Sequence, residues 1–295
     1  MERRKYGNTD MQVSILGFGG AEIGGADEKT VDRLLGTALE AGLNLIDTAE
    51  CYGRSEELIG KVLAGRRDEY YLFTKCGHAS GLDFADWDPV LLEKSIDRSL
   101  KRLNTDHVDV IHLHSCSEEI LRRGEVIRVL EAAKQAGKTR YIGYSGDRND
   151  ALYAVETGLF DSLETSLNIA DQEVIDLTLG KAAERGMGVT AKRPIANAAW
   201  ARAQVADTDY AYVYWRRLQE LQYGFLDDVQ QGVEIALRFT LSTPGVHTAI
   251  VGTQNPDRWP QNAALLQKGA LPQELYDEIR ARWHAAGSQD WVGQT

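Results

Sequence analysis

Eight short apolar segments alternate with longer amphipathic segments along the whole chain, and this alternation limits the possible folds more than any other feature. The short segments have the β-branched and apolar residues of strands, at residues 14–19, 43–48, 70–75, 108–114, 140–145, 161–166, 188–193 and 246–252. Neighbouring parallel strands need a crossover connection, usually a helix. Eight strand–helix units that close on themselves predict an α/β protein with a (β/α)₈ barrel.

The helical segments carry start and stop signals. Residues 88–104 begin with Asp88 and Pro89, an N-cap residue followed by a proline at the first helical position. Two other helical segments end at Gly42 and Gly137, which suit the position just after a helix. These signals indicate real helices between the predicted strands.

A doubly wound open sheet is the alternative to the closed TIM barrel. It fits the same alternation, but no G-x-G-x-x-G sequence follows the first strand. The chain also lacks an internal segment rich in proline, glycine or serine that would divide it. We therefore predict one domain over residues 1–295.

Two segments fall outside the repeat. Residues 1–13 predict an N-terminal β-hairpin that closes the bottom of the barrel. Residues 194–227 form a long loop and helix insertion after strand 7 and are rich in aromatic residues. Loops of this length in a compact domain tend to be functional. We expect most of these aromatic side chains to pack the insertion and one or two to line a pocket.

Composition excludes several classes of partner. The formal net charge of −11 argues against nucleic acid and against an anionic membrane surface. No apolar run approaches the roughly 20 residues of a membrane helix, and "MERRKYGNTD" does not resemble a signal peptide. A cytoplasmic protein is expected. The three cysteines, Cys51, Cys76 and Cys116, predict reduced thiols near the mouth of the pocket rather than a disulfide framework.

Ionisable residues end three successive predicted strands. Asp47, Lys75 and His114 each occupy an inward-facing position by the two-residue alternation of strands. Tyr52 follows the first of these strands, and His112 lies one layer deeper on the third. Barrel enzymes place their chemistry at the C-terminal ends of the strands. These side chains are therefore expected to meet at one rim.

This set of groups suits proton transfer to a carbonyl oxygen. A nearby ammonium group favours the phenolate and lowers the pKa of a tyrosine. In this arrangement Asp47 would hold Lys75 in place, and a histidine beside Tyr52 would polarise the substrate oxygen. Such a site can protonate a carbonyl oxygen while a hydride reaches the carbon, or run the reverse reaction.

A metal site is the alternative reading of the segment "HLHSC". His112, His114 and Cys116 alternate on one face, and an H-x-H strand occurs in barrel metallohydrolases. No other predicted strand adds an inward histidine, and Asp47 and Glu164 are the only carboxylates expected nearby. The lysine on the neighbouring strand would repel a cation. We predict no metal and a core position for His112.

The chain resembles the aldo-keto reductase superfamily over most of its length. The resemblance is carried in order by "DTAECYG" (47–53), "FTK" (73–75), "HLH" (112–114), "YIGYS" (141–145) and "VGTQNPDRWPQN" (251–262). It implies a catalytic tetrad of Asp47, Tyr52, Lys75 and His114. Tyr52 would be the general acid, Lys75 held by Asp47 would tune it, and His114 would orient the carbonyl. A nicotinamide would supply the hydride.

The resemblance also implies cofactor contacts. Ser145 matches the serine that holds the nicotinamide carboxamide, whereas Gly146 stands where an asparagine is usual. Glu164 replaces a glutamine and can accept but not donate a hydrogen bond when ionised. Lys192, followed by Arg193, stands where an aromatic residue often stacks.

At the adenosine end, the matching residues are Gly252, Thr253, Arg258, Gln261 and Asn262. Arg258 suits a 2′-phosphate because its guanidinium makes bidentate contacts, although Gly252 replaces the family lysine. NADPH/NADP⁺ is therefore expected, with NADH possible.

The resemblance implies an enzyme, an NADPH-dependent carbonyl reductase that reduces an aldehyde or ketone. A sugar or polyol dehydrogenase working in the oxidative direction and a non-catalytic nicotinamide-binding regulatory subunit are the alternatives. Substrate choice would lie in residues 76–88, 115–124, 194–227 and the tail 287–295. Few residues follow the last helical segment, which favours an open site and broad carbonyl specificity. The sequence does not fix the oligomeric state.

Overall fold

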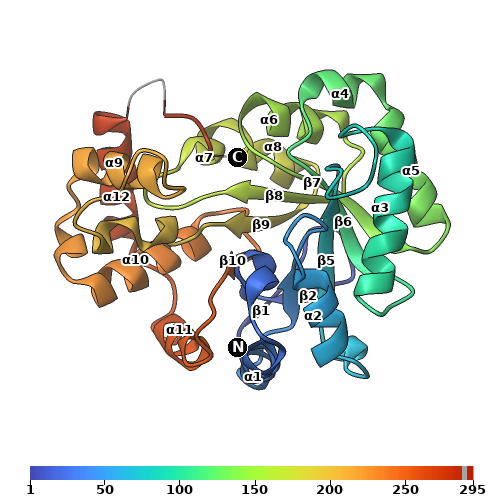
Figure 1. Cartoon of the computed structure of the whole chain (residues 1–295). Coiled ribbons are helices and arrows are strands. Elements are labelled where there is room, and N and C mark those ends of the chain that lie inside the picture. The colour runs from blue at the N-terminus through green and yellow to red at the C-terminus, as the bar shows by residue number, and fades with distance from the viewer. Residues whose placement is uncertain (288–290, 295) are drawn as a thin grey trace.

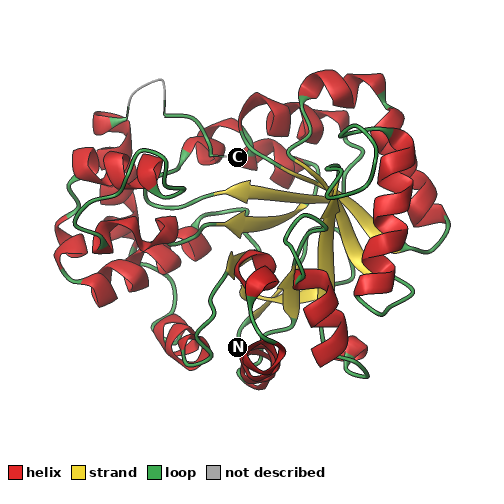
Figure 2. Ribbon diagram, viewed as in Figure 1, coloured by secondary structure: helices red, strands yellow, loops and turns green. Residues whose placement is uncertain are grey.

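The computed structural model describes residues 1–287 and 291–294. Within this part of the chain, eight parallel strands form a closed barrel in the order β10-β3-β4-β5-β6-β7-β8-β9. Figure 2 shows the strands in the middle with helices around them. The predicted (β/α)₈ barrel is confirmed. Its strands are β3 (Leu16–Gly19), β4 (Leu45–Asp47), β5 (Tyr71–Cys76), β6 (Val108–His114), β7 (Thr139–Ser145), β8 (Ser162–Ser166), β9 (Gly188–Lys192) and β10 (Thr248–Val251).

The helices begin and end where local signals place them. The Asp88 side chain accepts a hydrogen bond from the Val90 N–H, and Gly42 and Gly137 follow their helices with φ of 90° and 75°. No helix within residues 1–287 and 291–294 is long and apolar enough to cross a membrane. The α-helices (Figure 1) are α1 (Glu28–Glu40), α2 (Ser55–Val62), α3 (Pro89–Arg102), α4 (Glu118–Arg123), α5 (Glu125–Gln135), α6 (Arg148–Thr157), α7 (Glu173–Leu177), α8 (Leu179–Glu184), α9 (Tyr212–Leu221), α10 (Val229–Ser242), α11 (Arg258–Leu266) and α12 (Gln273–Ala286).

The predicted N-terminal hairpin closes one end of the barrel. Its strands, β1 (Arg3–Lys5) and β2 (Gln12–Ser14), pair antiparallel. The buried Tyr6 hydroxyl forms hydrogen bonds with Ser162 Oγ (2.7 Å) and Thr190 Oγ1 (2.8 Å) inside the barrel. Apolar side chains of the hairpin and of the inward strand faces form one cluster: Tyr6, Met11, Val13, Leu45, Phe73, Val110 and Ile250. These inward positions are the ones that the two-residue alternation predicts. The hairpin fills one end of the barrel, so the ionisable side chains at the C-terminal ends of the strands lie at the other end.

The insertion after β9 packs largely as expected. It contains the 3₁₀ segments η3 (Ala196–Ala201) and η4 (Gly224–Asp227) on either side of α9. Tyr214 and Tyr223 are buried in the core. Tyr210 is 69 % exposed and lines the cavity described below. The insertion therefore both packs against the barrel and contributes an aromatic side chain to a pocket.

The last described residues lie against the C-terminal ends of β8 and β9. Trp291 packs against Trp283 of α12, with ring centroids 5.3 Å apart. The Gln294 carbonyl accepts hydrogen bonds from Ser166 Oγ (2.6 Å) and from Arg193. Residues 288–290 and 295 of the predicted substrate-selecting tail lie outside the described part. The expectation of an open site stays a prediction.

Candidate active site

The ends of three successive strands bring the predicted ionisable groups to one rim of the barrel. Asp47 ends β4, Lys75 lies near the end of β5 and His114 ends β6. Strand pairing places Lys75 beside His112 of β6 and Asp47 beside Phe73 of β5. Because neighbouring parallel strands share this register, alternate side chains of all three strands enter the barrel at similar depth.

Lys75 is the centre of this group of side chains. It is 1 % exposed, and its Nζ lies 2.5 Å from Asp47 Oδ2, 3.1 Å from the Thr48 carbonyl oxygen and 3.3 Å from Glu164 Oε1. Burial opposes the charged ammonium, but Asp47 and Glu164 outweigh it and raise the pKa of Lys75. A buried ammonium with these acceptors is fixed in position. Lys75 is therefore a permanent positive charge.

The two carboxylates around Lys75 differ in their protonation behaviour. Burial opposes ionisation of Glu164, yet the charges of Lys75 and Lys192 outweigh it and lower the pKa of Glu164 to about 2. Burial and the Glu164 charge raise the pKa of Asp47 well above its usual range, against the effect of Lys75. Two carboxylates that share one ammonium cannot both be fully stabilised. Asp47 and Glu164 therefore titrate as one coupled pair, in which ionisation of one carboxyl group opposes ionisation of the other.

Tyr52 sits in a turn directly after β4. Its N–H donates to the Ala49 carbonyl (3.1 Å), and its carbonyl accepts from the Ser55 N–H (3.0 Å) at the start of α2. The Tyr52 ring centroid lies 5.5 Å from Lys75 Nζ. Burial is the largest influence on Tyr52 and raises its pKa. The Lys75 ammonium lowers that pKa, in the direction expected from the sequence, but it does not outweigh burial.

His114 packs edge-on against the Tyr52 ring, with centroids 5.7 Å apart. Its Nδ1 lies 3.5 Å from Cys51 Sγ. Burial, followed by the charge of Lys75, lowers the pKa of His114 well below its usual range. The imidazole is therefore neutral at neutral pH. A neutral imidazole can donate one hydrogen bond to a substrate oxygen without carrying a charge.

Sequence reasoning missed His78, whose ring lies beside the ring of His114. The His78 ring lies 5.3 Å from the His114 ring and 5.6 Å from that of Trp87. His78 Nδ1 is 2.9 Å from Asp86 Oδ2. The loop after β5 can hold His78 in this position because the Trp87 ring packs directly on Gly77. A Cβ atom at Gly77 would lie 2.3 Å from a carbon of that ring. The sequence feature that could have identified His78 as a site residue is its position just after Lys75.

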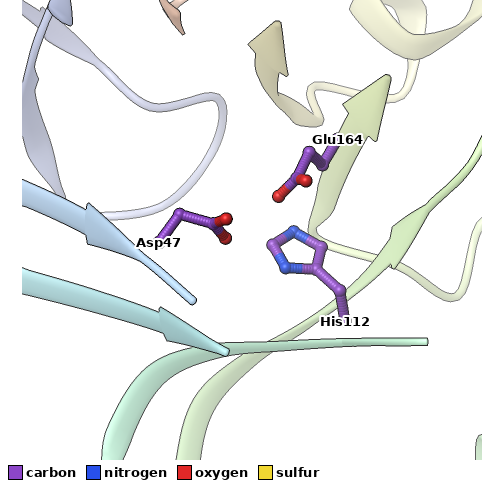
Figure 3. Close-up of side chains that lie close together, drawn as sticks. All are labelled: Asp47, His112 and Glu164. Carbon is purple, nitrogen blue, oxygen red and sulfur yellow. The ribbon is translucent and has the colours of Figure 1, made fainter. Parts of the chain in front are cut away.

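His112, Asp47 and Glu164 point toward one another (Figure 3), and one potential ligand atom from each lies within 4.8 Å of the others. The Nε2 of the buried His112 lies 2.8 Å from Ser162 Oγ, so its predicted core position is confirmed. The Lys75 ammonium lies against both carboxylates, where a cation would meet it. The expectation of no metal stays a prediction with this physical support.

A cavity of about 410 Å³ opens beside Tyr52. It runs from Asp47, Tyr52 and Glu164 to the ends of β9 and β10 and the insertion. Four of the predicted cofactor residues line it, namely Glu164, Lys192, Arg193 and Gly252. The cavity is therefore continuous with the rim that carries the ionisable groups.

Other residues that the sequence predicted to contact the cofactor near Glu164 are packed at the C-terminal end of the barrel. The buried Ser145 hydroxyl donates to Glu164 Oε1 (3.4 Å). Gly146 lies against the Tyr144 ring, where a Cβ atom would be 2.7 Å from ring atoms, so a larger residue would have to displace that ring. Lys192 Nζ forms an ion pair with Asp147 Oδ2 at 2.9 Å. Asp147 was not singled out from the sequence.

The predicted adenosine-end residues follow β10. Thr253 Oγ1 accepts a hydrogen bond from the Asn255 N–H (3.0 Å), and Asn262 is buried. Arg258 begins α11, is exposed, and lies 3.5 Å from Gln261 Oε1 through its Nη1. Arg258 has no carboxylate within ion-pair distance among the described residues. Its guanidinium is available to an anion.

The cysteines do not all lie where the sequence suggested. Cys51 is exposed beside His114, as expected for the pocket mouth. Cys76 and Cys116 are buried in the apolar layer between strands and helices. Their predicted position near the mouth is wrong, because their side chains point outward from the barrel to the helices.

Comparisons with known proteins agree with this architecture. The model of the "Aldo/keto reductase family" matches residues 15–284. The solved structure of aldo-keto reductase AKR11C1 from Bacillus halodurans, in its holo form, is 28 % identical with a TM-score of 0.85, covering 98 % of this chain and 99 % of that one. L-galactose dehydrogenase of Arabidopsis thaliana is 28 % identical over 99 % of this chain and 97 % of its own. An uncharacterized oxidoreductase of Bacillus subtilis, YqkF, is 27 % identical over 95 % of both chains.

Proposed function

The chain belongs to the aldo/keto reductase family, and from that membership we propose that it is an NADP(H)-dependent oxidoreductase that reduces an aldehyde or ketone to an alcohol. The observation that carries this proposal is the approach of Lys75 and His114 to the ring of Tyr52, which lines the cavity. Asp47 completes the proposed catalytic tetrad through its contact with Lys75.

The proposed roles follow from the protonation states. The Tyr52 phenol is protonated at neutral pH and can donate its proton to a carbonyl oxygen. The neutral His114 can donate a hydrogen bond to the same oxygen and so orient the carbonyl. Lys75 places a fixed positive charge near the oxyanion that would form. A nicotinamide cofactor, when bound, supplies the hydride.

The cavity fits a dinucleotide chemically. Arg193 lines it, contacts the neutral Tyr210 and Ser166 hydroxyls, and offers positive charge to a pyrophosphate. Lys192 and Arg202 also line the cavity, but they pair with Asp147 and Asp209. Glu164 offers a buried acceptor oxygen that has no hydrogen-bond partner among the described residues. We propose that Ser145, Gly146, Glu164, Lys192 and Arg193 surround the nicotinamide end, and that Gly252, Thr253, Arg258, Gln261 and Asn262 hold the adenosine end.

Fluorescence titration with NADPH and NADH, followed by a carbonyl panel with the tighter cofactor, tests the proposed function. Micromolar binding together with turnover of at least one carbonyl class would support it. No binding of either cofactor, or binding without turnover of any carbonyl, would contradict it.

Oxidation of a sugar or polyol is the second candidate. It is favoured by the similarity to an L-galactose dehydrogenase along nearly the whole chain. The same residues would act in reverse, with Tyr52 accepting the proton of the substrate hydroxyl. Rates measured in both directions with a sugar alcohol and the matching carbonyl would separate the two candidates.

Replacing Arg258 with alanine tests the preference for NADP(H). We expect the Kd for NADPH to rise about tenfold or more and the Kd for NADH to change less than about twofold, because a guanidinium binds a 2′-phosphate through charge-assisted hydrogen bonds. Arg33→Ala is the matched control, since Arg33 is also exposed but pairs with Asp257 at 3.0 Å. Equal effects of Arg258→Ala on both cofactors would contradict a 2′-phosphate contact.

A further inference from the structure

Two buried carboxylate oxygens at the catalytic end of the barrel have no hydrogen-bond partner within residues 1–287 and 291–294. They are Asp47 Oδ1 and Glu164 Oε2. The other oxygens of the same two groups, Asp47 Oδ2 and Glu164 Oε1, lie 2.5 Å and 3.3 Å from Lys75 Nζ. One ammonium group therefore holds two buried carboxyl groups next to each other.

The carboxyl groups of Asp47 and Glu164 point toward one another from β4 and β8 (Figure 3). One oxygen of each group lies within 4.8 Å of an oxygen of the other, and this approach allows a hydrogen bond between the two side chains. Two ionised carboxylates can only accept hydrogen bonds, because neither has a proton to donate. A hydrogen bond between them therefore needs one proton that belongs to the pair.

The charges of the buried ion pairs at this place balance when the two carboxyl groups hold one proton. Lys75 contacts both Asp47 and Glu164, and Lys192 is paired with Asp147 at 2.9 Å. With both carboxyl groups of the pair ionised, two positive and three negative charges leave a net charge of −1 on these buried side chains. An uncompensated buried charge is costly. One proton on the pair makes the net charge zero.

The other titratable groups around the pair are neutral near pH 7. Burial lowers the pKa of His112 to about 4. Burial, followed by the charge of the neighbouring ammonium, lowers the pKa of His114 well below its usual range. Burial raises the pKa of the Tyr6 and Tyr52 phenols, so both keep their protons. These four side chains therefore do not change the charge balance.

The two carboxyl groups ionise at widely separated pH values. Burial opposes ionisation of Glu164, but the charge of Lys75 outweighs it and lowers the pKa of Glu164 to about 2. Burial, followed by the charge of Glu164, raises the pKa of Asp47 well above its usual range. Such values describe the coupled pair, which loses its first proton in acid and its second at much higher pH. The pair therefore holds one proton at neutral pH.

We propose that Asp47 and Glu164 share one proton at neutral pH, and that Glu164, through this proton, sets the charge beside the phenol of Tyr52. Glu164 is then a positioning residue, which acts on Tyr52 through Asp47 and Lys75. Its Oε2 keeps a second lone pair for a ligand, because a carboxylate oxygen can accept more than one hydrogen bond. The effect on Tyr52 rests on the proposed function and deepens it.

Release of the shared proton in alkaline solution adds one negative charge near Tyr52. Asp47, Glu164 and Tyr52 all line the cavity, so the proton can pass to water there. Negative charge on either carboxylate raises the pKa of Tyr52 and opposes formation of the phenolate. Alcohol oxidation needs this phenolate as its proton acceptor, whereas carbonyl reduction needs the phenol. The pair therefore keeps Tyr52 in the form that serves reduction.

Infrared spectroscopy of the protein without cofactor tests the shared proton, because a protonated carboxyl group has a C=O stretching band that a carboxylate lacks. Spectra at pH 7 are compared for the wild type, Glu164→Gln and Asp47→Asn. In either variant the remaining carboxyl group pairs with Lys75 and ionises, so both variants should lose the same single band. Glu50→Gln is the control, since Glu50 is also buried but accepts from the His78 N–H (3.1 Å), and this variant should keep the band.

Two infrared results overturn the shared proton. Spectra in which neither variant loses a band show that both carboxyl groups are ionised. Loss of a different band in each variant shows that each group holds a proton of its own. Should one of the two variants fail to fold, the other decides, since loss of a band in it supports the shared proton and an unchanged spectrum overturns it.

The pH dependence of alcohol oxidation tests the effect on Tyr52. Above the pH at which the pair releases its proton, the wild type has one more negative charge beside the phenol than Glu164→Gln. The oxidation rate of Glu164→Gln divided by that of the wild type, both at saturating NADP⁺, should therefore rise about tenfold between pH 7 and pH 10. A ratio that does not change with pH indicates a purely structural role and overturns the effect on Tyr52. A wild type without turnover in either direction contradicts the proposed function instead, while the infrared spectra still decide the shared proton.

Discussion

Replacing Tyr52 with phenylalanine is expected to lower kcat for carbonyl reduction by about 10³-fold, within the range that general acid catalysis contributes. The Kd for NADPH should stay within about twofold, because the phenol is proposed to contact the reacting oxygen rather than the nucleotide. Steady-state rates and a fluorescence titration measure the two quantities. Tyr71→Phe is the control, since the Tyr71 hydroxyl contacts the Gln12 N–H of the hairpin at the other end of the barrel (3.2 Å).

The pH dependence of this reaction follows from the burial of the phenol. Burial, against the opposing charge of Lys75, raises the pKa of Tyr52 above its usual value of about 10. The protonated phenol is the proton donor, so reduction should be independent of phenol ionisation through neutral pH and decline only above that value. Wild-type turnover in Tyr52→Phe, or a basic limb near pH 7 that disappears in this variant, would contradict the assignment.

Replacing Lys75 with methionine is expected to destabilise the fold strongly as well as to reduce turnover. The change leaves Asp47 and Glu164 buried at the barrel end without their shared cation. Removing one partner of a buried ion pair typically costs about 3–5 kcal/mol in the free energy of unfolding. Urea unfolding followed by circular dichroism at pH 7 measures this loss. The exposed Lys61, paired with Glu28, is the control, and Lys61→Met should cost less than about 1 kcal/mol.

The loss should depend on pH in a defined direction. In the wild type, Lys75 lowers the pKa of Glu164 to about 2, so its contribution to stability is present above the unfolded value of about 4.3 and is lost as pH falls toward 2. Without Lys75 the buried carboxylates would have raised pKa values, so the variant should be least stable at neutral pH and approach the wild type on acidification. Lys75→Met combined with Glu164→Gln should recover part of the loss. A pH-independent loss, or no recovery in the double variant, would contradict this account.

The fold was predictable because its signals are local. Strand and helix periodicity, the Asp88 and Pro89 start signal and the C-terminal glycines Gly42 and Gly137 each reside in a few consecutive residues. Inward and outward faces follow from the alternation of side chains along each strand. The resulting ring of Asp47, Lys75 and His114 could therefore be placed at one rim before its distances were known.

Other properties of the site depend on residues far apart in sequence. The contact between Glu164 and Lys75 joins β8 to β5 across the barrel interior, and no local pattern encodes its distance. The raised pKa of Tyr52 depends on how completely the surrounding loops bury the phenol. The outward position of Cys76 follows strand alternation, because Lys75 before it points inward. Cys116 lies beyond the end of β6 and after Ser115, whose φ of 65° interrupts the alternation, so the pattern of the strand does not predict its side.

Deuterium transfer from the cofactor to the substrate tests the central claim most directly. The wild-type protein is incubated with NADPH deuterated at the transferred position of C4 and with each carbonyl of the panel, and the products are analysed by mass spectrometry. We predict an alcohol with one deuterium on the former carbonyl carbon, formed by the wild type and about 10³-fold more slowly by Tyr52→Phe. Tight NADPH binding without deuterium in any product, or equal rates in the two proteins, would contradict the proposed Tyr52-dependent carbonyl reduction.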